Sequence, residues 1–420
     1  MLSFGSSFDF LLRIPPRRKL SFILSSALIL SGPVTAVADS GAAGLDDTLN
    51  FSFGAGVRYD NNLFRLSDSE SPQPFLGTSQ KSDWVYSTNA GIKLDKPYSL
   101  QRFQLDAMLV DNKYRTYSFL DYSAFNYRAA WLWHLTPRVS GILLADQKQV
   151  LNNFSDFPNI ADKSIQTNQT HLFTIDADIG AGVHVLSGLL DVRSRNSKVF
   201  EAVGNYQQEG AEAGIKYVAP SQNWISVVQR ETLGKYRDRV LNPAAQLDSG
   251  FDQSETEANL SWRLTGKSMI DAKLGYIDRI HDHFSRRDFS GAISRLLWHW
   301  TPTGKLQFDL SLSRNLHSFQ EAANSYFVAD TLSVSPIWNY SAKTRFRFKY
   351  DYSDRDYRGA IAPTTKLRRD RVQSLLFSAD WQATRKILVS GMLQRDRRNS
   401  NTDSFDYDSN AVSINAQFLF

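Results

Sequence analysis

The sequence contains no cysteine, and after residue 38 it contains no apolar run of the length that a membrane-spanning helix requires. The absence of cysteine excludes disulfide bonds and thiolate metal sites. A helix needs about 20 predominantly apolar residues to cross a bilayer, so helical membrane proteins are excluded for residues 39–420. Both absences suit an exported protein, because an oxidising compartment penalises unpaired thiols.

The first 38 residues have the three parts of a secretory signal peptide. A basic segment ends at Lys19, an apolar segment covers residues 20–30, and Ala36-Val37-Ala38 is a cleavage site of the small-x-small type. The apolar segment is too short to cross a bilayer as a helix. We therefore predict a cleaved signal peptide over residues 1–38 and a single mature domain over residues 39–420.

The charge of the chain does not support nucleic-acid binding. The full sequence has 48 basic and 43 acidic residues and a net charge of +5. Without residues 1–38, 44 basic and 42 acidic residues remain, and the net charge falls to +2. No long basic run is present, and export directs the chain away from nucleic acid.

The mature chain shows apolar and polar residues in strict alternation. In the last nine residues Val412, Ile414, Ala416, Phe418 and Phe420 occupy one face of a predicted strand, and polar residues occupy the other. The same alternation recurs at 49–59, 125–134, 173–183, 255–264, 306–313 and 345–352. A period of two over about ten residues is typical of a barrel strand with one face toward lipid and one toward water.

The connections between these segments are alternately short and long. Short turns are predicted at 136–138, 186–188, 265–268, 301–305 and 383–386, and long polar loops at 60–82, 149–169, 237–251, 355–370 and 398–409. Transmembrane barrels have short periplasmic turns and longer outer loops. The sequence therefore predicts an all-β fold, a transmembrane antiparallel up-and-down β-barrel of about 18 strands. It would lie in the outer membrane of a Gram-negative cell, with both termini in the periplasm.

Aromatic residues favour this fold over a soluble β-sandwich or propeller. Six tryptophans precede predicted short turns, where a membrane interface would hold them: Trp131, Trp133, Trp298, Trp300, Trp338 and Trp381. The terminal residues Phe418 and Phe420 resemble the signal that the barrel-assembly machinery reads. Glycines at 54, 56, 180 and 182 are expected in mid-strand, as small inward residues, and not in phosphate-binding loops.

A barrel of about eighteen strands is on the order of 35 Å across and leaves room for a hydrated interior. We predict that the following basic residues line this interior: Arg193, Arg195, Lys273, Arg279, Arg295, Arg345, Arg347 and Lys349. They would form a stripe that attracts anions, as basic rings do in pores. The alternative is that they pair with inward aspartates such as Asp309, Asp351 and Asp380 and only stiffen the wall.

No catalytic residue, metal ligand or cofactor is predicted. The histidine pair in His281-Asp282-His283 has no third ligand at a defined spacing, so a solvated loop is the favoured interpretation. A serine–histidine–aspartate set assembles in space and leaves no sequence spacing to detect.

Three segments resemble EpsL-type proteins, the outer-membrane barrels of exopolysaccharide operons associated with exosortase systems. They are FSFGAGVRYDNNLFR at 51–65, SFLDYSAFNYRAAWLWHLTPRVSG at 118–141 and WHWTP at 298–302. The resemblance implies a passive conduit that exports a polysaccharide. Its partners would be the polymer, outer-membrane lipid, the barrel-assembly machinery, and periplasmic and inner-membrane synthesis or export proteins. A diffusion porin or uptake channel is the alternative function, and an outer-membrane hydrolase the second alternative.

Overall fold

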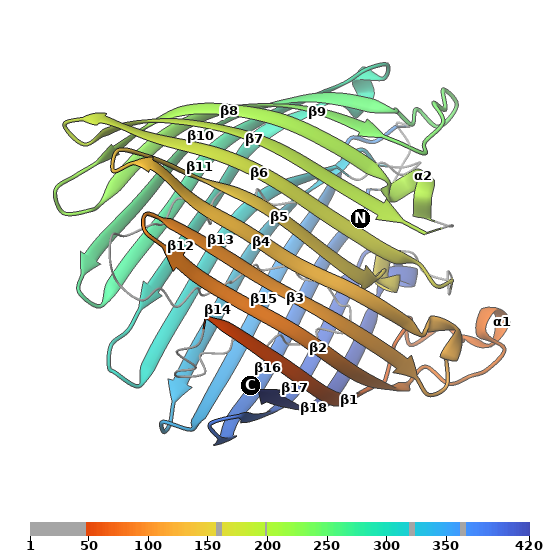
Figure 1. The fold of residues 1–420 in the computed structure, drawn as a ribbon. Helices are drawn as coiled ribbons and strands as arrows, with labels where there is room; N and C mark the ends of the chain where they lie inside the picture. The colour runs from red at the N-terminus through yellow and green to blue at the C-terminus, as the bar shows by residue number, and fades with distance from the viewer. Residues whose placement is uncertain (1–47, 157–161, 198–199, 319–323, 362–366) are drawn as a thin grey trace.

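The computed structural model describes residues 48–156, 162–197, 200–318, 324–361 and 367–420, and their strands form one closed sheet (Figure 1). Eighteen antiparallel strands follow one another around the barrel in chain order, and β1 pairs with β18 to close it. The predicted all-β, up-and-down barrel of about 18 strands is thereby confirmed. The predicted signal peptide, residues 1–38, lies outside the described residues.

The strands are β1 (Leu49–Asp60), β2 (Asp83–Tyr98), β3 (Gln101–Tyr114), β4 (Tyr122–Thr136), β5 (Val139–Leu151), β6 (Ile165–Gly180), β7 (Val183–Asn196), β8 (Tyr206–Val218), β9 (Trp224–Tyr236), β10 (Gly250–Thr265), β11 (Ser268–His281), β12 (Phe289–Trp300), β13 (Leu306–Ser318), β14 (Tyr326–Asn339), β15 (Thr344–Arg358), β16 (Arg369–Thr384), β17 (Ile387–Ser400) and β18 (Tyr407–Leu419).

Helical structure is confined to the long connections. These hold two four-residue helices, α1 (Gln73–Leu76) and α2 (Glu201–Gly204), and 3-10 turns at Ser118–Leu120, Phe154–Asp156, Ser285–Arg287 and Asp403–Phe405. Within the part of the chain that the structure describes, no helix is long and apolar enough to cross a membrane.

Each strand has an apolar outward face and a mostly polar inward face, as the alternation in the sequence predicts. Outward residues such as Phe53, Leu274 and Ile414 are 54%, 64% and 58% exposed. The register keeps such residues in common rows, for example Phe53 opposite Phe418 and Val57 opposite Ile414. Apolar side chains can face lipid at no cost in free energy. Polar side chains need water or ion pairs as partners, so they face the interior.

One predicted turn is wrong. Residues 186–188 lie inside β7, and the chain reverses instead at Ala181 and Gly182. Gly180, Ala181 and Gly182 have φ values of 107°, 52° and 77°, which glycine adopts without strain. Gly180 is therefore the last residue of β6 and Gly182 is a turn residue, so neither lies in mid-strand, and positive φ explains the presence of both glycines.

The register shows where the six predicted tryptophans lie. All six lie on the outward face near the short turns, and several stack on aromatic neighbours, such as Trp298 with Trp300 and Phe103 with Trp131. This arrangement matches an aromatic girdle at a membrane interface.

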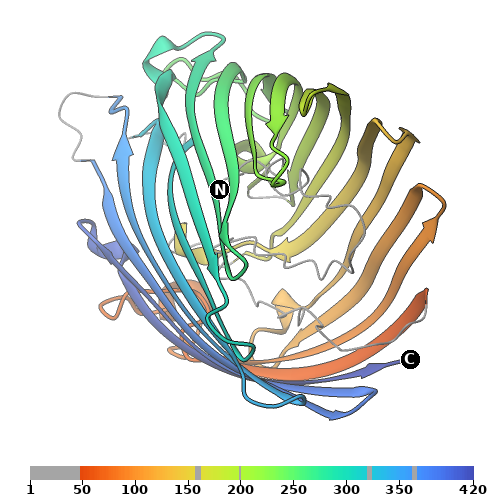
Figure 2. The same cartoon turned by 90° about the vertical axis from the view of Figure 1, so that its left-hand side faces the viewer.

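The long connections gather at the opposite end of the barrel from the short turns (Figures 1 and 2). β1 begins and β18 ends at the short-turn end, where the Phe51 amide donates to the Phe420 carbonyl at 3.0 Å. The two ends of the described barrel are thus joined to each other by backbone hydrogen bonds.

Candidate functional site

The candidate site is the barrel interior together with the long-loop end. Eighteen strands enclose a cylinder on the order of 35 Å across, which is wider than barrels whose side chains fill the interior. What passes through such a barrel depends on the inward side chains and on loops that fold over the opening.

Inward charges are mostly paired. On β8 to β11 the Arg230 guanidinium lies 3.0 Å from Glu212, 3.2 Å from Glu255 and 3.1 Å from Glu257. Lys273 contacts the same two carboxylates, Glu255 and Glu257. All these side chains are largely buried in the wall. The predicted pore-lining Lys273 is therefore inward, but its charge is balanced by glutamates.

The same pairing occurs on β15. Lys349 lies 2.7 Å from Asp351, and Arg345 lies 3.3 Å from Asp380 on β16. Arg347 points inward between them and forms no ion pair with any described residue. The pairing that the sequence offered as an alternative thus holds for Arg345 and Lys349, whereas Arg347, half-buried on the same inward face, has no ion pair with a described residue.

Two other predicted residues are also inward. Arg279 donates to Gln253 at 2.9 Å and lies over the ring of Phe251 at 3.8 Å. Arg295 faces Lys273 across the β11–β12 ladder, so its side chain shares the inward face.

Arg193 and Arg195 do not line the interior. They lie on the same face of β7 as Leu189, which is outward and 59% exposed. The alternate residues, Ser194 and Asn196, are buried on the other face. The prediction is wrong because β7 continues past the apolar band. Beyond that band outward side chains are polar as well, so charge no longer indicates the inward face.

The loop between β1 and β2 folds onto the barrel mouth through the sequence Tyr59-Asp60-Asn61-Asn62 of the segment 51–65. Asp60 binds Arg65 at 3.0 Å and Arg58 at 3.2 Å, and Asn62 exchanges two hydrogen bonds with the backbone of Leu66. This turn places Phe64 and Leu66, both almost fully buried, in an apolar cluster. The other members of the cluster include Val85, Tyr114, Tyr117, Leu120, Tyr122, Leu151 and Phe154.

The cluster also accounts for the Leu-Asp-Tyr motif. Leu120 is fully buried in it, and the Asp121 carboxylate accepts the Tyr114 amide at 2.7 Å. Both motifs that resemble EpsL-type proteins therefore fold the loops of β1 to β6 together. Their roles in this structure are in packing and hydrogen bonding of the loops.

The loop between β5 and β6 reaches the opposite part of the wall. Asp156 lies 2.9 Å from Arg398 on β17 and 3.3 Å from Arg368 ahead of β16. Arg398 also donates to Ser155, through its carbonyl and its hydroxyl, at 2.8 Å each. Burial alone would raise the pKa of Asp156, but Arg398, Arg355 and Arg368 hold that pKa well below its usual range. We call this arrangement the Asp156 bridge.

A second set of contacts joins the loops of the other half. Arg287, which is fully buried, donates to the carbonyls of Gln246, Ala245 and Asn324 at 2.8, 2.8 and 2.5 Å. These carbonyls belong to the β9–β10 and β13–β14 connections. One side chain therefore satisfies buried acceptors from two loops besides its own.

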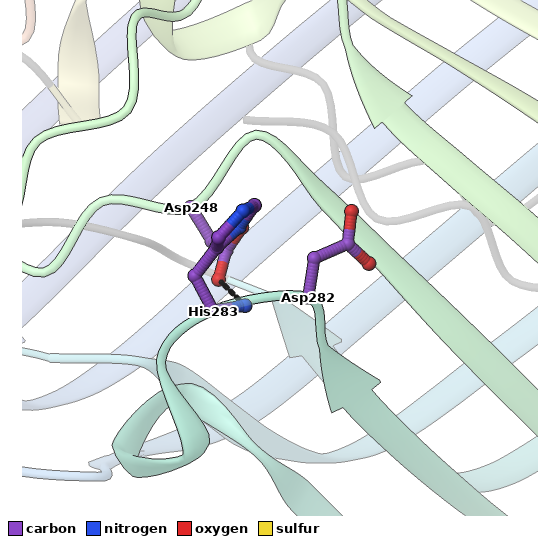
Figure 3. A group of neighbouring side chains, drawn as sticks. All are labelled: Asp248, Asp282 and His283. Carbon is purple, nitrogen blue, oxygen red and sulfur yellow. Dashed lines mark hydrogen bonds and ion pairs between the residues drawn. The ribbon is translucent and has the colours of Figure 1, made fainter.

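Asp248, Asp282 and His283 are the described residues closest to a cation site, with ligand atoms within 4.8 Å of one another (Figure 3). The carboxylate of Asp248 already accepts several hydrogen bonds from the protein. It accepts the His283 and Phe284 amides at 2.8 and 2.9 Å, the Ser249 amide at 2.8 Å and the His283 ring at 3.0 Å. A carboxylate offers about four acceptor positions, and these four donors occupy them. Asp248 therefore joins the two loops, and a cation could bind only by displacing the donors.

Comparisons with known proteins describe the chain further. Among solved structures it is similar to the outer-membrane protein OpdK of Pseudomonas aeruginosa (12% identity, 90% of this chain and 100% of that chain, TM-score 0.47). It is also similar to OccK2 (OpdF) of the same organism (12%, 89% and 98%, 0.49) and to OccAB4 of Acinetobacter baumannii (10%, 89% and 99%, 0.46). No curated protein matches it. A family model described as "Putative beta-barrel porin 2" matches residues 210–420, half of the chain, and the protein belongs to that family.

Proposed function

We propose that the protein is a passive channel through which small hydrophilic solutes diffuse across the outer membrane. The observation that supports this most is the closed eighteen-stranded barrel with an apolar outer face, a polar inner face and loops folded over one end. Family membership supports it as well. The short-turn end would face the periplasm, as short turns do in such barrels.

The inward charges support weak selectivity. Lys273 and Arg345 are balanced by carboxylates on neighbouring strands and Lys349 by Asp351 on its own strand. Such balanced parts of the wall attract neither sign strongly. Arg347, which has no ion-pair partner among the described residues, is the residue we propose to bias the channel toward anions. Lys273, Arg279, Arg295, Arg345 and Lys349 would line the same path.

The test is conductance in planar bilayers. The purified protein should form open channels, and liposomes that contain it should swell in small sugars but not in large ones. Arg347→Gln should shift the reversal potential in a salt gradient toward cations. The inward substitution Ser378→Gln, directly opposite Arg347 on β16, removes no charge and should leave the reversal potential unchanged. A protein that is folded and inserted but does not conduct would contradict the proposal.

Export of a polysaccharide is less well supported. It rests on three segments resembling EpsL-type proteins, and two of these fold the loops. A polymer would also have to pass a mouth crossed by the Asp156 bridge. Deletion of the gene distinguishes the two functions. Unchanged extracellular polymer with reduced small-solute uptake supports the channel, whereas polymer trapped in the periplasm would support export and the synthesis partners that export requires.

The hydrolase alternative lacks a supporting arrangement. His184 and His299 pair with Asp176 and Asp309 at 2.6 and 2.5 Å, which resembles two thirds of a catalytic set. Yet within the described ranges no serine or threonine hydroxyl bonds a histidine ring. A nucleophile in reach of its base is what such catalysis requires.

A further inference from the structure

The outward face of β15 to β18 carries a cluster of arginines just beyond the apolar band, toward the long loops. These strands are neighbours in the barrel (Figure 1). The cluster, called here the arginine patch, consists of Arg358, Arg369, Arg371, Arg395 and Arg397, accompanied by Asp354, Asp356 and Asp408. Five arginines against three aspartates give it a net charge of +2.

The register fixes the depth of the patch. Arg395 lies opposite Leu375, which is outward and 41% exposed, and two residues before it on β17 is the outward Leu393. Each further outward residue lies about 7 Å along the strand. Arg397, Arg371 and Arg369 therefore lie at successively greater distances from the apolar band, toward the long loops. This is the level where lipid headgroups begin.

Three of the five arginines are paired and two are not. Arg369 lies 2.8 Å from Asp354, Arg395 lies 2.6 Å from Asp408, and Arg358 lies 2.9 Å from Asp356. Arg371 and Arg397 have no carboxylate partner among the described residues, and Arg397 only donates to Asn399 at 3.2 Å. The unpaired guanidinium groups are exposed and lie in the middle of the patch.

These two arginines are placed to hold one anion together. Arg397 faces Gln373 and Arg371 faces Asn399, so they are diagonal neighbours on adjacent strands. Diagonal neighbours on one face have backbones about 7–8 Å apart, which long side chains can span. The planar guanidinium matches phosphate with two parallel hydrogen bonds.

The charge is localised and does not encircle the barrel. On β8 to β10 the corresponding outward positions carry Glu209, Glu231 and Asp252. Gln229 and Ser254 donate to Glu231 at 2.7 and 3.0 Å. A general attraction to anionic lipid would be served by basic residues all around the barrel. Basic residues on one side and acidic residues on another instead favour a single lipid bound at one place.

We propose that the arginine patch binds the phosphate groups of a phosphorylated glycolipid, lipopolysaccharide, in the leaflet on the long-loop side. Arg371 and Arg397 hold a phosphate, and the apolar residues below them, Leu375, Phe377 and Leu393, contact the acyl chains. The lipid then covers the outward side of the wall whose inner side carries Arg398 of the Asp156 bridge.

The experiment measures lipopolysaccharide retained by the full barrel after extraction in mild detergent, by native mass spectrometry. Wild type is compared with Arg371→Gln/Arg397→Gln and with a charge-matched control, Arg193→Gln/Arg195→Gln, on the outward face of β7. All three must show the heat-modifiable electrophoretic migration of a folded barrel. Should the double variant fail to assemble, Arg397→Gln alone replaces it.

Wild type and control should retain about one lipopolysaccharide molecule per barrel, and the patch variant should lose it at least tenfold faster on dilution. Equal retention by the patch variant would overturn the proposal. A further arm adds inorganic phosphate in place of the lipid and records thermal unfolding. If phosphate alone raises the melting temperature as much as deep-rough lipopolysaccharide does, the patch is a site for free anions and the lipid assignment is wrong.

Discussion

Asp156 and Arg398 lie 2.9 Å apart although 242 positions separate them in the sequence. Asp156 belongs to the connection between β5 and β6, and Arg398 belongs to β17, on a separate part of the barrel wall. The pair fixes a loop over the opening of the barrel. The opening of the proposed channel therefore depends on a contact that neither segment forms alone.

Replacing Asp156 should widen the opening. Asp156→Ala removes the loop carboxylate that pairs with Arg368 and Arg398, which keep Asp370 as a partner. Loss of one partner of a buried ion pair costs up to about 3–5 kcal/mol. We expect the loop to be released, single-channel conductance to rise, and trypsin to cleave faster after the exposed Lys163. Asp403→Asn, in an exposed loop, serves as the control and should leave both quantities unchanged. Unaltered conductance in Asp156→Ala would show that the loop does not limit flow.

Acid should have the same effect as that substitution. The folded-state pKa of Asp156 is lowered, so its ion pairs stabilise the loop fully above the unfolded-state pKa of about 3.9. This stabilisation is lost as the pH falls below that value toward the lower folded-state pKa. Conductance recorded from pH 7 downward should stay constant to about pH 4 and increase only progressively below it, as the pH falls toward the lowered folded-state pKa. Asp156→Ala should show no such increase, and a parallel rise in both proteins would point to other groups.

Arg287 should keep the loops on the other half of the barrel in a fixed conformation. Arg287→Met removes the donors of three carbonyl oxygens, and each buried group left unsatisfied costs about 1–3 kcal/mol. Limited trypsin digestion should then cleave the β9–β10 loop faster after Arg237 and Arg239, while the barrel stays heat-modifiable. The neighbour Arg286, exposed and with one 3.3 Å bond to the Ile361 carbonyl, provides the control Arg286→Met. Equal cleavage rates in the two variants would contradict the role given to Arg287.

Charge placed on the outward face should impair assembly. Phe377 is outward and Ser378 inward on β16. Phe377→Arg should destabilise the barrel by about 2–4 kcal/mol, as cations near the bilayer midplane do. Ser378→Arg should have a much smaller effect, because its side chain enters the polar interior. Urea unfolding in lipid vesicles measures both, and the reverse order would refute the assignment of faces.

The last aromatic residue should affect the rate of assembly. Phe420 contacts Phe53 edge to face at 6.1 Å, and its amide donates to the Phe51 carbonyl at 2.9 Å. Phe420→Ala keeps the backbone bonds but removes the ring that we propose the assembly machinery reads. We expect slower appearance of the folded band in cells and a nearly unchanged stability once folded. The outward Trp381→Ala, far from the terminus, should not slow assembly.

The sequence predicted the strands well because one physical constraint acts on every strand. A wall between lipid and water requires a period of two, and that period is visible in single segments such as 306–313. It located turns less well. Gly180 to Gly182 were expected in mid-strand, since the alternation from Phe173 runs through Ile179 to Val183 without a break, and only the positive φ values reveal the reversal.

Charged residues were the least predictable. Arg345 and Lys349 were expected inward and are inward, but their partners depend on register. Arg193 and Arg195 are outward, because the rule that charge faces inward applies only within the apolar band.

By itself, then, the sequence determined the all-β barrel, its approximate number of strands and which end has the long loops, because these follow from local alternation and spacing. The tertiary structure decided how Asp156, Arg287 and Asp248 join the loops, and which arginines remain unpaired. Those contacts connect residues far apart in the chain, and they exist only when strand register and loop folding bring the charges within a few ångströms of one another.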